Sequence, residues 1–516
     1  MSGLFAFHGG LKTVRHKTES NQTPIQTPPL PPRLLVPLRQ HIGNPAKPLV
    51  QPGDRVLKGQ MIGQADGYIS AAVHAPTSGV VVALEPVPVP HPSGLADWCV
   101  VIDSDGEERW IDRQAVDYRQ MHPSDLRNWI RNSGVVGLGG AVFPSAVKMN
   151  LSGHCERLEH LILNGAECEP WITCDDRIMR ERAAQIVAGI HILAHLLNPR
   201  EVLIGIEDDK PDAIAAMSAA CAGTGYQVRA VPTRYPSGDV KQLTKLLTNK
   251  EAPIKGRSTD IGVQCFNVAT AYTVHRAVNH GEPVISRIVT VTGHVRQPGN
   301  VEALIGTPFS ALIDWAGGYR EGAERLIMGG PMMGFALHSD EVPVTKAANC
   351  ILIAGAADLP AEQPALPCIR CGACVEVCPA NLLPQQLYWH ARAREFDKAQ
   401  DDQLFSCIEC GCCSYVCPSH IPLVQYYRFA KNEIWAQEKE KQKAELARQR
   451  HQARVERLER EKQEREAKLR QKAPAKAASP VGESAQVPLE TAVARARSAR
   501  ESVTAPATAD SDAAQG

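Results

Sequence analysis

The spacing of hydrophobic residues changes several times along this chain, and each change predicts a different kind of element. Between residues 37 and 110, short apolar runs alternate with turns such as Pro52-Gly53-Asp54, which predicts a compact region of short strands. Between residues 115 and 285, strand-like apolar runs alternate with helical patterns, which indicates an α/β domain. In that domain we expect helices at 125–132, 180–197, 211–222 and 240–248, and strands at 160–164 and 202–206.

The apolar pattern that follows, in residues 286–350, has the order strand, turn, strand and helix, with the turn at Pro298-Gly299. This order predicts a β-grasp module. The methionine-rich turn at 328–334 is expected to pack in a core rather than to hold a cofactor, because methionine adapts its shape to irregular gaps.

Neither end of the chain is predicted to have a core. The proline-rich residues 1–36 predict an extended arm, in which the turn His8-Gly9-Gly10 is either a plain loop or a docking point. Residues 436–472 are almost wholly charged, with oppositely charged residues four positions apart, which predicts a solvated single helix or, alternatively, a partner-bound helix. Residues 473–516 are rich in alanine, serine and proline and are predicted to be disordered.

Half of the sixteen cysteines fall into two copies of one spacing. The runs CIRCGACVEVCP and CIECGCCSYVCP, which begin at residues 368 and 407, both follow C-x2-C-x2-C-x3-C-P. Three closely spaced thiolates can hold three corners of a [4Fe-4S] cluster, and in two-cluster ferredoxins the fourth ligand comes from the other motif. A pair of zinc knuckles is the alternative, although zinc sites usually join two shorter cysteine hooks. We therefore assign Cys368, Cys371, Cys374 and Cys417 to one cluster and Cys407, Cys410, Cys413 and Cys378 to the other.

The residues around these motifs complete the domain prediction. The segment between the two runs has a helical pattern, so residues 360–435 are predicted to form an all-helical two-cluster domain. Cys412 lies in the second run but off the spacing, and is expected to be a bystander.

Length and charge narrow the classes of function. The chain has 516 residues, which suggests three or four domains, and its 56 basic and 56 acidic residues give no support to a nucleic-acid partner. No apolar run approaches the roughly 18 residues that span a bilayer, and the N-terminal residues lack the pattern of a signal peptide. We therefore expect a soluble protein of the reducing cytoplasm that reaches a membrane only through partners.

Loops of the α/β region carry a second candidate site. The glycine-rich residues 134–148 precede a predicted helix, so they can present backbone N–H groups to a phosphate, although a tight packing turn has the same pattern. Carboxylates in 165–170 follow a predicted strand, where open α/β sheets bind ligands. Together with the loops at 235–239 and 267–270, these segments resemble the flavin-bearing, NADH-oxidising subunit of complex I.

That resemblance implies roles for nine residues. Phe143 would stack on the nicotinamide of NADH, and Glu169 would hold its ribose or amide. The sequence departs from the pattern at Leu138, Ala166 and Ala269, which replace an arginine, an aspartate and a glutamate, and at Asp239-Val240, where the pattern has two glutamates. The phosphate-binding part is largely kept, and the residues that would hold FMN are Gly137, Gly139, Gly140, Lys148, Asn164, Asn267 and Thr270.

The order of regions along the chain resembles the RnfC/RsxC family, which belongs to the Rnf (Rsx) ion-translocating electron-transport complex. The runs that carry this resemblance are FHGG, GLGGAVFPSAVK, NGAECEP, SGDVKQL, LLPQQLYW and the two cysteine motifs. The implied fold is multidomain α/β plus β: a barrel-sandwich hybrid, a flavin-subunit-like α/β domain, a β-grasp (SLBB) domain and a helical two-cluster ferredoxin domain. The barrel-sandwich hairpin at 67–72 has no lysine, so a structural role is expected instead of a swinging covalent cofactor.

The resemblance also implies a function. The chain would be a peripheral, oxidoreductase-type subunit that passes electrons between NAD(H), FMN and two [4Fe-4S] clusters. Its partners would be the other subunits of a membrane-bound complex, including a ferredoxin-like subunit, at the cytoplasmic face of the bacterial inner membrane. Two alternatives stay open: the flavin subunit of a soluble hydrogenase or formate dehydrogenase, and an iron–sulfur wiring subunit that does not bind NADH.

Overall fold

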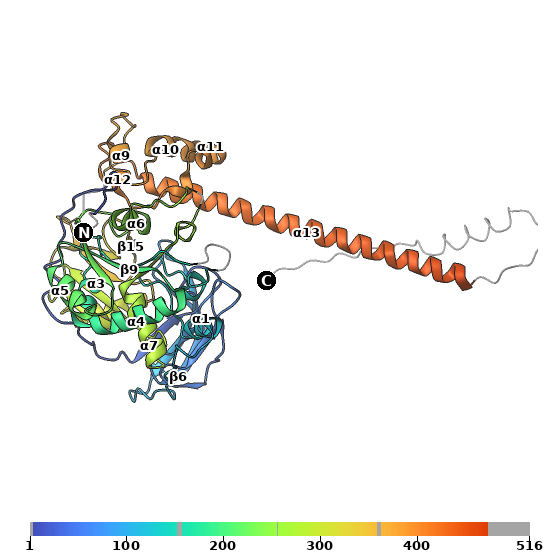
Figure 1. Ribbon diagram of the computed structural model, residues 1–516, viewed down its shortest axis with the longest axis horizontal. Helices are drawn as coiled ribbons and strands as arrows, with labels where there is room; N and C mark the ends of the chain where they lie inside the picture. Colours follow the sequence, from blue (N-terminus) through green and yellow to red (C-terminus); the bar gives the residue numbers. More distant parts are fainter. Residues whose placement is uncertain (1–3, 152–156, 255, 359–362, 473–516) are drawn as a thin grey trace, which may run out of the picture. The chain divides into compact units, whose positions relative to one another are not determined.

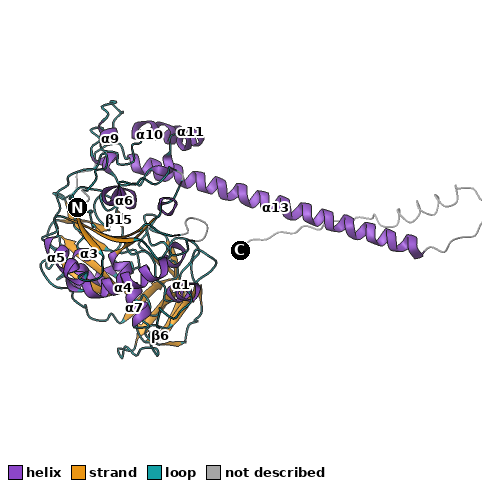
Figure 2. Ribbon diagram, viewed as in Figure 1, coloured by secondary structure: helices purple, strands orange, loops and turns teal. Residues whose placement is uncertain are grey.

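The computed structural model describes residues 4–151, 157–254, 256–358 and 363–472 (Figure 1). Residues up to Gln437 belong to one compact unit and those from Glu438 to a second. The described chain is a mixture of helices and strands, as expected (Figure 2). The tail predicted to be disordered, 473–516, lies outside the described residues.

Seven short strands near the N-terminus form two small antiparallel sheets, in the orders β1-β7-β6-β3 and β2-β4-β5. Their core is not separate, because apolar side chains such as Val36 and Ile102 pack in one cluster with Val289 and Ile351 of the β-grasp region. The strands are β1 (Arg33–Pro37), β2 (Lys47–Pro48), β3 (Arg55–Val56), β4 (Met61–Gln64), β5 (Val73–His74), β6 (Gly79–Pro88) and β7 (Ala96–Ser104).

The α/β region contains a parallel sheet with the strand order β10-β9-β8-β11. The chain moves outward from β8 to β9 and β10, and then returns to place β11 on the other side of β8. In open α/β sheets, such a reversal leaves a crevice at the carboxyl ends of the strands where ligands bind. The strands are β8 (His160–Gly165), β9 (Glu201–Glu207), β10 (Gln227–Val231) and β11 (Val263–Asn267).

The helices of this region lie close to the predicted positions, with one correction. The single helix expected at 180–197 is two helices, α3 (Cys174–Glu181) and α4 (Ala183–Leu197), which meet at Arg182. Helices α4 and α7 pack tightly, because Gly189 lies against the backbone of Ala271 and leaves no room for a side chain (Figure 1). The other helices are α1 (Pro123–Asn132), α2 (Ser145–Lys148), α5 (Pro211–Ala220), α6 (Val240–Thr248), η1 (Ser258–Ile261) and α7 (Val268–Asn279).

The β-grasp region has a five-stranded mixed sheet in the order β13-β12-β16-β14-β15. Its central strands β12 and β16 are buried along their whole length, which fits their continuous apolar and threonine-rich sequences. The elements are β12 (Ser286–Gly293), β13 (Gly299–Leu304), α8 (Phe309–Trp315), β14 (Ala323–Met328), β15 (Phe335–Leu337) and β16 (Cys350–Gly355).

The cysteine motifs lie in a region that is helical between residues 363 and 437, as expected. The charged helix predicted at 436–472 begins earlier, because α13 runs from Leu423 to Lys472 and its first turns pack Tyr427 and Ile434 into the cluster domain. From Glu438 onward its described side chains are almost all exposed. The other helices are α9 (Ala373–Glu376), α10 (Pro384–Ala393), α11 (Phe396–Asp401), η2 (Leu404–Ser406) and α12 (Cys412–Tyr415). Across the described helices, none is both long and apolar enough to serve as a membrane span.

The N-terminal arm contributes side chains to the cores of the body, which the sequence did not indicate. Phe7 is 8% exposed and packs with Leu243 and Leu246. The arm also bonds through its backbone, because Leu11 pairs with Tyr235 and Gln26 with Val301. Proline-rich extended segments have no internal hydrogen bonds, so the arm bonds to the surface along which it runs.

Lys346 links the barrel-sandwich region to the segment that leads into the glycine loop. Its side chain is completely buried, and Nζ donates to the carbonyls of Ala72 (2.9 Å) and Gly134 (2.7 Å). Burial lowers the pKa of Lys346 to about 7, because the ammonium form loses its hydration.

This burial predicts a pH dependence of stability. An unfolded lysine keeps a pKa near 10.5, so the unfolded chain binds more protons than the folded chain between about pH 7 and that value. We therefore expect Lys346 to raise the free energy of unfolding by up to about 3 kcal/mol between pH 7 and pH 10. Denaturant unfolding at both pH values should show that Lys346→Met removes this rise, whereas Lys47→Met, at an exposed lysine, keeps it. Equal pH slopes in the two variants would contradict the prediction.

Candidate flavin and iron–sulfur site

A cavity of about 660 Å³ opens at the carboxyl ends of β8 and β11, where the strand order reverses. Its size is in the range of cofactor sites. All nine residues predicted to bind FMN or NADH line it. They come from three separate segments of the chain, 137–148, 164–169 and 267–270, so the fold brings together what the sequence only suggested.

The glycine loop forms one wall. At Leu138 the backbone N–H donates to Thr270 Oγ1 (2.9 Å), which ties the loop to α7. Gly140 has φ +107° and open space where a Cβ would point, so a side chain there would be strained and would project from the loop. The loop thus exposes backbone toward the cavity, as a bound phosphate requires.

The helix expected after the glycine loop is a single turn of four residues, α2. The longer α7, of twelve residues, begins at the cavity instead. Asn267 caps it, since Oδ1 accepts from the N–H of Ala269 (2.9 Å), while Nδ2 donates to Asp175 (2.5 Å). The helix N-terminus that favours an anion here is therefore that of α7.

Lys148 and Asn164 lie at the base of the cavity. Lys148 Nζ donates to the carbonyl of Cys265 and lies 4.8 Å from the ring centre of Phe266. Burial lowers the pKa of this ammonium group, which would gain from an anionic partner. Asn164 is engaged within the protein, donating to Gly238 O (2.8 Å) and accepting from the N–H of Ala166 (3.1 Å). A cation, a helix N-terminus and exposed glycine backbone together fit the phosphate of FMN.

Glu169 faces the cavity, but one of its oxygens is occupied. Oε1 accepts from the backbone N–H groups of Met332 (2.7 Å) and Met333 (3.0 Å). Burial raises the pKa of this carboxyl group, and the two hydrogen bonds oppose the shift. Glu169 thus fastens the methionine-rich turn to the cavity, and its predicted contact with NADH stays a prediction.

The methionine-rich turn at 328–334 forms part of the cavity wall rather than only a core. Met328 is 7% exposed and packs in a hydrophobic cluster, as expected, whereas Met333 is 46% exposed and lines the cavity. The sequence did not suggest this wall, whereas the buried Tyr235 beside it belongs to the loop at 235–239 that was expected at the site.

The two cysteine quartets assigned from the spacing each line one cavity. Cys368, Cys371, Cys374 and Cys417 surround a cavity of about 420 Å³. Cys378, Cys407, Cys410 and Cys413 line a second one, and backbone N–H groups of Leu382 and Glu409 point to the sulfur atoms of Cys378 and Cys407 (both 3.4 Å). The cysteines of the described chain are all free of disulfides. Four thiols around one space are what a [4Fe-4S] cluster requires. That the ligand sets are crossed, with each cluster taking its fourth cysteine from the other motif, remains a prediction.

The second quartet lies against the flavin cavity. Cys410 lines both spaces, and the buried Tyr235 donates from its hydroxyl to the carbonyl of Cys410 (2.7 Å). The His8-Gly9-Gly10 turn contacts the cluster region of the same chain, because the N–H of Gly10 donates to Val377 O (2.9 Å) next to Cys378. The first quartet is more open, with Cys371 exposed.

Comparison with known proteins places the chain in a family. It is 52% identical to the C subunit of the ion-translocating oxidoreductase complex of Pseudomonas aeruginosa, over 90% of this chain and 60% of that protein. It is 48% identical to the corresponding protein of Serratia proteamaculans, over 99% of this chain and 72% of that protein.

The chain belongs to the RnfC/RsxC family, the C subunits of ion-translocating oxidoreductase complexes. The relatives in this family are longer, and the chain spans 60%, 65% and 72% of the length of three of them. The air-oxidised and H2-reduced structures of an NAD+-reducing [NiFe]-hydrogenase are 16% identical to the chain, with TM-scores of 0.41 and 0.42. These two alignments cover 57% and 62% of this chain and 60% and 62% of the solved chains, and such scores add nothing to the assignment.

Four domain families match the sequence of this RnfC-family member. They are the RnfC barrel sandwich hybrid domain at 5–107, the Nuo51 FMN-binding domain at 130–276, the SLBB domain at 288–336 and the 4Fe-4S dicluster domain at 367–421. These matches confirm the predicted fold class, and they confirm FMN and [4Fe-4S] clusters as the cofactors. The match to a 4Fe-4S dicluster domain leaves no reason to prefer the zinc alternative. The first match includes most of the arm, which agrees with its packing on the body.

The structure also adds a buried cluster of charges beside the flavin cavity of this RnfC-family chain. Lys17, from the arm, is 7% exposed and donates from Nζ to the carbonyls of Glu167 (2.7 Å), Glu169 (3.1 Å) and Ile172 (2.6 Å). The Glu167 carboxylate accepts from the backbone N–H groups of Asp175 (2.6 Å) and Asp176 (3.2 Å). These two hydrogen bonds cap the N-terminus of α3. No spacing in the sequence indicated that Lys17 would reach this loop, which is about 150 residues away.

Replacing Lys17 by methionine is expected to destabilise the protein. The change leaves three buried or partly buried carbonyl groups without their donor and removes a cation 3.8 Å from Glu167, so we expect the free energy of unfolding to fall by about 3 kcal/mol. The midpoint of urea unfolding, followed by tryptophan fluorescence, should fall, because Trp171 lies in the loop that Lys17 holds. Lys12→Met, at an exposed lysine of the same arm, should leave it unchanged. Equal midpoints for the two variants would refute this role of Lys17.

Proposed function

We propose that this chain is the electron-transfer subunit that passes electrons between NAD(H) and a ferredoxin-type partner in a membrane-bound, ion-translocating complex. The observation that carries the proposal is the shared wall at Cys410, which belongs both to the flavin cavity and to the space of the second cysteine quartet. When bound, FMN exchanges a hydride's two electrons with a nicotinamide and single electrons with [4Fe-4S] clusters.

The residues of the chain have distinct tasks in this proposal. Lys148 and the N-terminus of α7 hold the phosphate, and the glycine loop lets the flavin approach the backbone. Phe143 lines the cavity with part of its ring exposed, where it would stack on the nicotinamide. Tyr235 excludes water between the cavity and the cluster loop, because it is 1% exposed and fastened to Cys410.

The first cysteine quartet is the proposed exit for electrons. Cys371 is exposed, and the space beside it is lined by Ile369 and Trp389, which are 68% and 39% exposed. Arg370 and Arg392 are exposed near these side chains, and Arg392 lies 5.7 Å from the ring centre of Trp389. An apolar centre with basic groups around it suits an acidic, ferredoxin-like subunit. The family name implies the membrane-bound complex, to whose cytoplasmic face we assign the chain as a peripheral subunit.

An anaerobic titration of the reconstituted protein with NADH tests the proposal. Absorbance should show bleaching of the flavin, and EPR should then show reduced clusters. A Cys378→Ser variant, lacking the second cluster, should still bleach its flavin but should leave the first cluster oxidised, because the path through Cys410 is interrupted. Flavin that stays oxidised under NADH, with clusters that dithionite reduces, would overturn the proposal and indicate a wiring subunit without NADH binding.

A further inference from the structure

Arg287, near the start of β12 in the β-grasp region, is a buried cation close to the flavin cavity. Its side chain is 5% exposed. Its guanidinium donates to three backbone carbonyls: those of Ile288 (3.3 Å), Lys346 and Leu138 (3.3 Å). Its side-chain partners in the described chain are these carbonyls and the thiol of Cys174, with no carboxylate hydrogen-bonded to it, although buried charges are normally paired.

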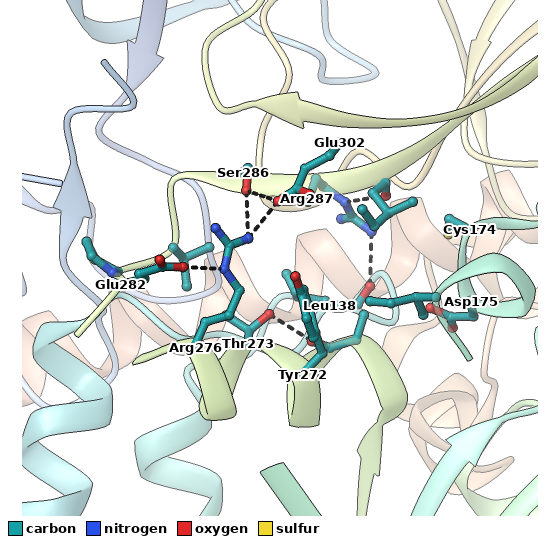
Figure 3. A pocket seen from close by; sticks show the side chains of 15 residues that line it. Leu138, Cys174, Asp175, Tyr272, Thr273, Arg276, Glu282, Ser286, Arg287 and Glu302 are labelled. Carbon is teal, nitrogen blue, oxygen red and sulfur yellow. Dashed lines mark hydrogen bonds and ion pairs between the residues drawn. The ribbon is translucent and has the colours of Figure 1, made fainter. Parts of the chain in front are cut away.

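The bond to Leu138 reaches the centre of the glycine loop, which belongs to another domain. Figure 3 shows the guanidinium of Arg287 joined by a dashed line to the carbonyl of Leu138. The N–H of the same residue is held from α7 by Thr270. Leu138 is therefore fixed on both sides, between Gly137 and the two glycines that follow, where the chain would otherwise have much conformational freedom.

The positive charge of Arg287 is also not fully balanced by a negative charge beside it. Burial lowers its pKa, yet an arginine stays protonated in a protein. Asp175 is a candidate for a counter-charge, since its charge opposes this lowering of the Arg287 pKa and it lines both the small cavity beside Arg287 and the flavin cavity (Figure 3). Its carboxylate accepts from Asn267 (2.5 Å), and burial raises its pKa, which disfavours the ionised form. An anion in the flavin cavity would complete the balance.

The β-grasp region also contributes in other ways to the same cavity. Its methionine-rich turn forms a wall and is held by Glu169. Thr290 of β12 accepts from the N–H of Thr173 (3.0 Å), which precedes α3. The glycine loop itself has no cation before Lys148, so the positive charge that bonds to Leu138 comes from β12.

We infer that Arg287 is a positioning residue of the flavin site, and that the β-grasp domain completes this site by holding the glycine loop. Arg287 holds the Leu138 carbonyl away from the cavity, so that the neighbouring N–H groups remain available to FMN. Its charge adds to that of Lys148 in favouring the anionic cofactor. This inference rests on the proposed flavin site and assigns the β-grasp domain a role in it.

The test measures FMN affinity of the full-length, cluster-containing protein by fluorescence quenching, in three variants. Arg287→Gln should weaken FMN binding about tenfold or more, because it removes the charge and the bond to Leu138. Arg287→Lys keeps the charge and should bind at least threefold more tightly than Arg287→Gln. Arg296→Gln, at an exposed arginine of the same domain whose guanidinium donates to Gly317 O (2.8 Å), should bind within twofold of the original protein.

Two results would overturn the inference. One is an unchanged FMN affinity in Arg287→Gln with its cluster absorbance intact. The other is a loss that lysine does not recover, which would indicate packing alone. If Arg287→Gln does not fold, Arg287→Lys decides alone: it should bind FMN at least threefold more weakly than the original protein, and equal affinity would overturn the inference. Failure of the original protein to bind FMN would instead refute the proposed function.

Discussion

Replacing Cys378 by serine is expected to halve the iron content of the protein, and the iron lost should belong to the cluster of the second motif. Cys378 is in the first motif but lines one cavity with Cys407, Cys410 and Cys413. Serine provides a harder oxygen ligand, which [4Fe-4S] clusters do not favour. Iron per chain and EPR of the dithionite-reduced protein would show the loss.

Double variants distinguish crossed from uncrossed ligand sets. If Cys378 and Cys407 hold one cluster, the double variant Cys378→Ser/Cys407→Ser should keep about half of the iron, because the second change affects a cluster already lost. Cys378→Ser/Cys374→Ser should lose nearly all of it. If each motif instead held its own cluster, Cys378→Ser/Cys407→Ser should lose nearly all of the iron and Cys378→Ser/Cys374→Ser should keep about half. Cys412→Ser serves as the matched control, since this buried neighbour of Cys410 lies off the spacing and should leave iron unchanged.

Replacing Lys148 by alanine is expected to weaken FMN binding by about tenfold to a hundredfold. A charge-assisted hydrogen bond to a phosphate contributes about 1.5–3 kcal/mol, and no other lysine or arginine lines the described cavity. Equilibrium dialysis of the variant with FMN gives the dissociation constant.

Riboflavin, which lacks the phosphate, provides the control for this prediction. Lys148→Ala should change riboflavin affinity little, whereas an equal loss for both ligands would place the ammonium group elsewhere than at the phosphate. Lys245→Ala, at a partly exposed lysine on α6 that pairs with Glu251, should leave both affinities unchanged.

The fold was predictable where the signal is local. Cysteine spacing indicated two quartets because a [4Fe-4S] cluster constrains ligands within a few residues of each other. Hydrophobic periodicity located β8, β9, α5 and α6 because alternation and helical spacing reflect which face of an element is buried. It missed the break at Arg182, since the apolar pattern continues across both helices.

The candidate site was predictable only in part. The glycine loop and Lys148 carry a pattern that the resemblance could transfer, and the structure places all nine chosen residues around one cavity. Lys17 and Arg287 escaped notice, as did the bond from Tyr235 to Cys410, because each side chain acts on a loop more than a hundred residues away in the sequence. No local pattern distinguishes a lysine in a polar arm that becomes buried from one that stays in water.

The sequence by itself determined the family, the cofactor classes and the order of domains, because these depend on residue types at short spacings. The tertiary structure decided how the domains share their interiors: the arm is part of the body, the barrel-sandwich and β-grasp regions have one hydrophobic core, and Cys410 meets the flavin cavity. The physical reason is that burial and hydrogen bonding across domains depend on which surfaces come together in the folded chain. Such contacts have no period and no motif along the sequence.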